Sequence, residues 1–228
     1  MNGQIYRSNL ERIQAQIETA CLKSGRKPET VKLVTVTKSV EPTEIPVLLD
    51  LGLREFGENR WQVAKPKLEL ECAAQAAWHF IGTLQLNKVK YIVPRFQWIH
   101  SIDSTELGQA ISQAAMKHDR EINALVQVNV SGEQQKHGIY PEETFSVVEQ
   151  LWRLPGIRLR GLMTMAPKTD DPESTRFVFR ELARVLSDLQ KKFDPDVMNQ
   201  LSMGMSDDFP VAIEEGATII RIGRSLLQ

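Results

Sequence analysis

The chain has 228 residues, and its 28 Lys and Arg residues almost balance its 29 Asp and Glu residues. This balance, without a dense basic run, argues against a surface for nucleic acid or for an anionic membrane. The N-terminus lacks the apolar segment of a secretory signal, and no stretch is long and apolar enough to span a bilayer. Cys21 and Cys72 have no metal-like partner spacing, so we expect reduced thiols, no metal site and a cytoplasmic location.

An amphipathic helix opens the chain, because Tyr6, Leu10, Ile13, Ile17 and Ala20 recur at steps of three and four. Strand-like and helix-like segments then alternate. The strand predictions rest on β-branched and apolar runs and cover residues 31–40, 54–60, 78–85, 96–104, 122–131, 157–167, 199–206 and 218–225. The helix predictions between them cover residues 41–52, 60–77, 87–94, 105–119, 141–155, 171–193 and 207–217.

This alternation predicts a parallel sheet, and eight repeats in one domain favour a (β/α)8 TIM barrel. A doubly wound open sheet is the alternative. No linker divides residues 1–228, so we expect a single domain. We expect no helix after the eighth strand, and the N-terminal helix would fill that gap in the outer ring. Pro66 should kink or delay its helix, and Asp171 should cap the helix that follows Pro172.

In such barrels the chemistry lies at the carboxyl ends of the strands. Lys38 is the most informative residue there, since burial against an apolar wall would favour a neutral amine able to form a Schiff base with an aldehyde. A lysine that only reaches for solvent is the alternative. The predicted ring of polar residues comprises Lys38, Glu58, Asn59, Gln85, Asn87, Asp103, Asn129, Ser202, Ser206 and Arg221 to Ser225.

Two loops near the C-terminus have the composition of an anion site. Gly204 and Ser206 lead from a strand into a helix, and Gly223 ends the last strand. Small residues and free N–H groups at such places bind phosphate, although tight turns alone would also explain them. A reactive amine facing a phosphate site fits a phosphorylated aldehyde. Pyridoxal 5′-phosphate (PLP) and a phosphorylated sugar are both consistent with these residues.

The sequence resembles the pyridoxal phosphate homeostasis proteins, which are small fold-type III proteins related to the barrel of alanine racemase. The matching stretches are LVTVTKSV, FGENRWQ, WHFIGTLQLNK, HSIDS, VQVNVSGEQQKHG, RGLMTMAP, LSMGMSDDF and RIGRS. The resemblance implies that Lys38 holds PLP as a Schiff base, that Ser206, Gly223 and the amide of Arg224 hold its phosphate, and that Arg221 faces the pyridine nitrogen. It also implies a ring pocket of Val36, Asn59, Met165 and Ser202.

The chain departs from that family at several positions. Thr83 stands where His is common, and Leu86 where Ser is common. Arg224 replaces a small hydroxyl residue, so the family's hydroxyl contact to phosphate is not carried over to this position. The chain ends in LLQ in place of an aromatic residue and glycine.

Arg221 also bears on the chemistry, because a guanidinium beside the ring nitrogen disfavours its protonation and leaves a poor electron sink. Racemisation needs a second acid or base on the opposite face, and Tyr6, Tyr91 and Tyr140 do not fall at strand ends. We therefore expect a PLP-binding protein of vitamin B6 homeostasis. The alternatives are a PLP-dependent racemase, a sugar-phosphate enzyme that uses Lys38, and an interaction module whose partner, an apoenzyme or a regulatory protein, senses the cofactor. A monomer is expected.

The remaining conspicuous residues have ordinary explanations. His79 and His100 fall within strands and are expected to be hydrogen-bonded core histidines. His137 lies on a loop, where a role in a turn competes with a place at the pocket rim. Glu58 would form a hydrogen bond in the mouth or cap a helix.

Overall fold

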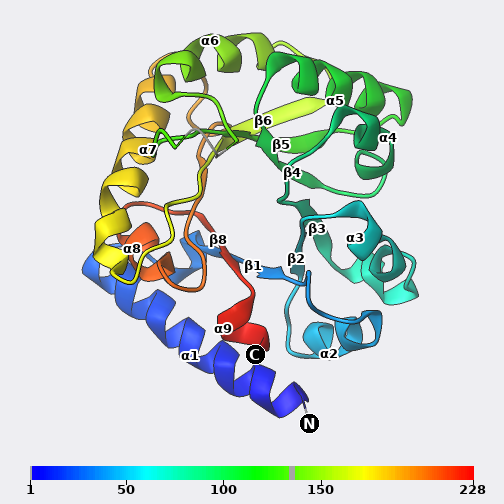
Figure 1. Cartoon of the computed structure of the whole chain (residues 1–228), viewed down its shortest axis with the longest axis vertical. Helices are drawn as coiled ribbons and strands as arrows, with labels where there is room; N and C mark the ends of the chain where they lie inside the picture. The colour runs from blue at the N-terminus through cyan, green and yellow to red at the C-terminus, as the bar shows by residue number, and fades with distance from the viewer. Residues whose placement is uncertain (1, 134–136) are drawn as a thin grey trace.

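A computed structural model describes residues 2–133 and 137–228 and shows a closed barrel of eight parallel strands in the order β1 to β8 (Figure 1). β1 pairs with β2 on one side and with β8 on the other, which closes the sheet. The strands are β1 (Lys32–Val36), β2 (Glu55–Glu58), β3 (Ala77–Phe80), β4 (Trp98–Ile102), β5 (Ile122–Gln127), β6 (Ile157–Met163), β7 (Gln200–Ser202) and β8 (Ile219–Ile222). The predicted barrel is confirmed, and the open sheet is wrong.

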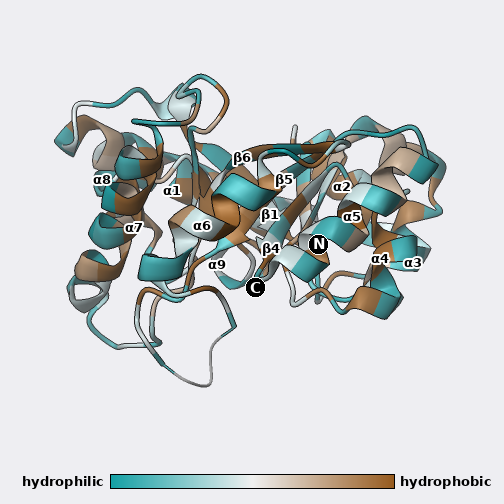
Figure 2. Ribbon diagram, turned by 90° about the horizontal axis from the view of Figure 1, so that it is seen from above, coloured by the Kyte–Doolittle hydropathy of each residue, from teal (hydrophilic) through white to brown (hydrophobic). Residues whose placement is uncertain are grey.

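Helices surround the strands. They are α1 (Asn2–Lys23), α2 (Ile45–Asp50), α3 (Trp61–Leu68), α4 (Val89–Ile92), α5 (Thr105–Lys117), α6 (Pro141–Leu151), α7 (Arg176–Leu189), α8 (Phe209–Glu214) and α9 (Arg224–Leu227). Short 3-10 turns occur at Pro28–Thr30, Pro42–Glu44, Glu71–Gln75, Leu86–Lys88 and Pro172–Thr175. In Figure 2 the helices carry teal and brown stretches in alternation, as expected of helices with one buried face. None of the described helices is both long and apolar enough to cross a bilayer.

The expectation that no helix follows the last strand is wrong, because α9 begins directly after Gly223. The expected place of the N-terminal helix is confirmed, since α1 contacts α8, α9 and α2 (Figure 1). Asn9 and Arg12 of α1 donate hydrogen bonds to the carbonyls of Leu226, Gln228 and Ser225. The first and last segments of the chain therefore close the outer ring together.

Two expectations about helix boundaries need correction. Asp171 does accept a hydrogen bond from the amide of Glu173, but it caps the 3-10 turn that precedes α7 rather than α7 itself. The helix predicted at residues 60–77 begins without delay at Trp61 and ends at Leu68, two residues after Pro66. A separate 3-10 turn, Glu71–Gln75, follows it.

Most of the apolar core lies between the strands and the helices, and a smaller apolar cluster of Val34, Trp98, Leu125, Met163 and Ile219 lies apart from it. The smaller cluster belongs to the barrel interior, where alternate side chains of each strand point. The interior also holds His79 and His100, which are fully buried and hydrogen-bonded as expected. The motif at residues 126–138 includes residues 134–136, which lie outside the described part of the chain.

Candidate functional site

A cavity of about 670 Å³ opens at the carboxyl ends of the strands. It is lined by eight of the nine residues predicted to bind the cofactor, and the exception is Ser202, which is fully buried. The eight lining residues are Val36, Lys38, Asn59, Met165, Ser206, Arg221, Gly223 and Arg224. Residues from β1 and β8 and from the segments after β1, β2, β6, β7 and β8 thus meet in one place, as the barrel topology requires.

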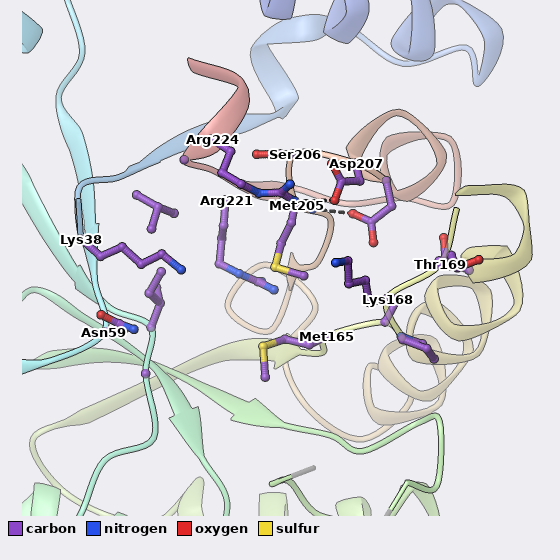
Figure 3. A pocket seen from close by; sticks show the side chains of 18 of the residues that line it. Lys38, Asn59, Met165, Lys168, Thr169, Met205, Ser206, Asp207, Arg221 and Arg224 are labelled. Carbon is purple, nitrogen blue, oxygen red and sulfur yellow. Dashed lines mark hydrogen bonds and ion pairs between the residues drawn. The ribbon is translucent and has the colours of Figure 1, made fainter. Parts of the chain in front are cut away.

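Lys38 lies two residues beyond the end of β1, and its side chain points into the cavity toward Arg221 (Figure 3). The amide of Thr37 donates to Gly57 O at 3.0 Å, and the amide of Val40 donates to Thr37 O at 2.9 Å. These two bonds hold the turn that presents Lys38. The side chain of Lys38 is exposed at the cavity, so the expected burial of its amine against an apolar wall is absent.

A buried ion pair lies behind this turn, and sequence reasoning missed it. Lys67 Nζ lies 2.6 Å from Glu58 Oε1 and donates to Thr37 O at 2.5 Å, and Thr37 Oγ1 donates to the same carboxylate oxygen at 2.7 Å. Glu58 is 0 % exposed and Lys67 is 1 % exposed. The expectation that Glu58 lies in the mouth or caps a helix is wrong, because its carboxylate pairs with Lys67 of α3 and does not line the cavity.

The segment after β7 brings small polar groups to the cavity. Gly204 has φ +90°, and an added Cβ would lie 2.6 Å from Ala212 Cβ, so glycine is required where the chain turns toward α8. Asp208 Oδ1 accepts a hydrogen bond from the amide of Met205 at 2.6 Å and holds this turn. Burial raises the pKa of Asp208.

The start of α9 lies against that segment. The amide of Ser225 donates to Ser206 Oγ at 3.4 Å, and the exposed side chain of Arg224 pairs with Asp207. Within the described residues, the backbone N–H groups of Ser206 and Arg224 donate to no protein acceptor. The cavity wall therefore offers one hydroxyl and two free amides, which is a donor set suited to an anion.

Arg221 forms the floor of the cavity. It is 4 % exposed, and it donates to Ser202 Oγ at 2.6 Å and to Thr164 O at 3.0 Å. Burial lowers the pKa of Arg221 to about 10, while the nearby charge of Asp208 opposes this shift. The guanidinium is therefore still cationic at neutral pH. Its hydrogen bond to Ser202 Oγ holds it at the cavity floor.

Several members of the predicted ring lie elsewhere. Gln85, Asn87, Asp103 and Asn129, which follow β3, β4 and β5, do not line the cavity. Gln127, Thr83 and Lys168 line it instead. No cluster of three or more potential metal ligands occurs in residues 2–133 and 137–228.

The family model for the alanine racemase N-terminal domain matches residues 8–227. A pyridoxal phosphate homeostasis protein of Aquifex aeolicus is 41% identical over 217 residues, which cover 95% of each chain. One from Escherichia coli is 33% identical over 222 residues, covering 96% of this chain and 94% of its own.

Solved structures show the same relationship. PipY of Synechococcus elongatus, solved with PLP bound, superposes with a TM-score of 0.86 at 32% identity and covers 98% of this chain and 100% of its own. Alanine racemase of Clostridium difficile shares the fold alone, with a TM-score of 0.74 at 16% identity over 98% of this chain and 56% of its own. The chain therefore belongs to the family of pyridoxal phosphate homeostasis proteins, within the wider group that has the alanine racemase N-terminal fold.

Proposed function

We propose that this protein binds PLP in the cavity at the carboxyl ends of the strands and takes part in controlling the supply of this cofactor. The observation that carries the proposal is the placement of the Lys38 amine in a cavity whose floor is the Arg221 guanidinium and whose wall has free N–H donors. The relatives' names and the PLP bound to PipY point the same way.

The residues present fit each part of PLP. The phosphate would lie against Ser206, Gly223 and the amide of Arg224, where a dianion gains hydrogen bonds that the chain does not itself use. The pyridine nitrogen would face Arg221, and Val36, Asn59 and Met165 would line the ring, with Ser202 supporting Arg221 from below. Bound PLP supplies an aldehyde, which joins Lys38 Nζ as a C=N bond with loss of one water.

An absorbance spectrum with borohydride trapping tests the proposal. The protein incubated with PLP should absorb in the visible range, and reduction should fix one pyridoxyl phosphate group on Lys38, found by peptide mass spectrometry. Lys38→Ala should lose both signals. Lys168→Ala is the matched control, since Lys168 is also an exposed cavity lysine, and it should keep both. A wild-type protein that takes up no PLP refutes the proposal.

We also propose that the bound cofactor undergoes no regular turnover. Among the described residues, Tyr6, Tyr91 and Tyr140 all lie outside the cavity lining, so none is placed as a second acid or base. Tyr6 instead donates to Glu44 at 2.6 Å, and Tyr91 stacks on Trp61. The comparisons do not support the racemase alternative. Exchange of solvent deuterium into Cα of amino acids faster than with free PLP would contradict this proposal.

Supply of PLP to cofactor-free enzymes, or recognition by a regulatory protein, would follow from a reversible C=N bond. We propose that a single domain, residues 1–228, does this as a cytoplasmic monomer. Mixing the loaded protein with a PLP-dependent apoenzyme should restore that enzyme's activity. A sugar-phosphate aldehyde trapped on Lys38 from the natural source would instead favour the sugar-phosphate alternative.

A further inference from the structure

A continuous chain of hydrogen bonds crosses the barrel interior from the cavity floor to the opposite end of the barrel. Arg221 Nη1 donates to Ser202 Oγ at 2.6 Å, and Ser202 Oγ lies 2.9 Å from His100 Nδ1. His100 Nε2 lies 2.9 Å from His79 Nδ1, and His79 Nε2 lies 2.6 Å from Glu55 Oε2. Glu55 is the first residue of β2, so the chain ends at the amino ends of the strands.

The direction of every bond in this chain follows from its last member and from the neutral state of both imidazoles. The carboxylate of Glu55 can only accept, so His79 carries its proton on Nε2 and accepts at Nδ1. His100 must then donate from Nε2, which leaves its Nδ1 to accept the hydroxyl proton of Ser202. Ser202 Oγ in turn accepts from Arg221, because a guanidinium can only donate.

The charges around the chain agree with two neutral imidazoles. His79, His100 and Ser202 are fully buried. Burial lowers the pKa of His79, although Glu55 opposes the shift. Burial is also the largest cause that lowers the pKa of His100 well below its usual value, and the cations of Arg221 and Lys32 act in the same direction.

The two ends of the chain carry opposite charges. Lys32 of β1 forms a salt bridge with Glu55 at 2.8 Å and lies over the ring of Trp98. Asp208 acts on Arg221 from the segment before α8. A buried cation at one end and a half-buried anion at the other polarise every hydrogen bond between them in the same direction.

We propose that Ser202, His100, His79 and Glu55 are positioning residues that hold the Arg221 guanidinium at the cavity floor and couple its electrostatic environment to Glu55 at the opposite end of the barrel. Where the inference concerns the cofactor, it rests on the proposed function. Glu55 would thus influence a group in the cavity without touching it.

Nitrogen-15 NMR of the histidine side chains in the cofactor-free protein tests the chain by itself. His79 and His100 should both be neutral and protonated on Nε2, with a scalar coupling across the bond between them. In Glu55→Gln the signals of both should move, although His100 does not contact residue 55. Glu121→Gln is the matched control, because Glu121 directly precedes β5 at the same end of the barrel, pairs only loosely with Arg158 at 3.8 Å, and lies outside the chain. A charged imidazolium, a proton on Nδ1 of either histidine in the wild type, or an unmoved His100 signal in Glu55→Gln overturns the proposal.

The second measurement follows the visible absorbance of the PLP-loaded protein with pH. Two forms of the bound PLP, protonated and deprotonated, should be distinguished by this absorbance. Glu55→Gln should move the midpoint between them to lower pH by about half a unit, because loss of an anion disfavours the protonated form. Glu121→Gln should leave the midpoint unchanged. Equal midpoints in wild type and Glu55→Gln refute the coupling. If the wild type binds no PLP, the proposed function fails, while the NMR measurement still decides whether the chain exists.

Discussion

The buried pair of Lys67 and Glu58 allows a sharp test of what supports the cavity. Lys67→Met keeps the aliphatic bulk of the side chain but removes the ammonium group. Glu58, which is 0 % exposed, then keeps a carboxylate without its cation, and Thr37 O loses the donor that lay 2.5 Å away. Breaking a buried pair by removing one partner destabilises a protein by about 3–5 kcal/mol.

The expected shift in melting temperature follows from the chain length. An unfolding entropy of about 2.1 cal/mol/K per residue gives about 0.5 kcal/mol/K for the 228 residues. A loss of about 3–5 kcal/mol therefore corresponds to a decrease of about 6–10 °C. Differential scanning calorimetry measures the melting temperature, and urea unfolding measures the free energy of unfolding independently.

Lys65→Met is the matched control, because Lys65 lies on the same helix and faces Glu69 at 3.8 Å with both side chains more than half exposed. An exposed pair contributes about 0–1 kcal/mol, so this variant should melt close to the wild type. Adding Glu58→Gln to Lys67→Met should recover part of the loss, since no uncompensated carboxylate is left. If Lys67→Met is no less stable than Lys65→Met, the reasoning is wrong.

Three further predictions concern pH, packing and the phosphate wall. Because the pKa values of His79 and His100 are lowered in the folded protein, the unfolded chain binds more protons below about pH 6.5, and stability should fall on acidification by up to about 1.4 kcal/mol per pH unit for each histidine. Urea unfolding between pH 5 and 7 measures this slope, which His100→Gln should reduce. Gly82→Ala would place a Cβ 2.2 Å from Asn59 O, so it should lower the unfolding free energy by about 1–3 kcal/mol and weaken PLP binding; unchanged values in both assays contradict the crowding. Arg224→Ala keeps the backbone amide and should change the Kd for PLP by less than about fivefold, whereas a larger loss in a fluorescence titration would mean that the side chain itself binds phosphate.

The barrel could be predicted from the sequence because the alternation of apolar strands and amphipathic helices repeats eight times in order. The strands in the structure are shorter than predicted, because the residues at the end of each predicted strand belong to the segment that follows it. β1 ends at Val36, although the predicted strand extended to residue 40. Lys38 therefore belongs to a turn, and the turn rather than the strand aims it at the cavity.

The buried polar systems could not be read from the sequence, since they join residues distant in the chain. Lys67 belongs to a short helix that also carries Gln62 and Lys65, and only its burial beside Glu58 distinguishes it. His79 and His100 were correctly expected to be hydrogen-bonded, but their partners lie on β2 and β7. Barrel closure brings these strands together, and the residues on one strand do not specify the register of another.

The four residues of β2 support both charged groups of the cavity, and their alternation explains how. Glu55 and Glu58 are separated by an odd number of positions, so their side chains point to opposite faces of the strand. Glu55 begins the chain that reaches Arg221 across the interior, while Glu58 faces α3 and holds Lys67 against the turn before Lys38. Gly57 lies between them, and an added Cβ would lie 2.9 Å from Val34 Cγ1. A slip of one residue in β2 would exchange the two faces of the strand. Arg221 would then lose the hydrogen-bond chain from Glu55, and the turn before Lys38 would lose the pair of Glu58 and Lys67. The register of this strand therefore links the fold to the binding site.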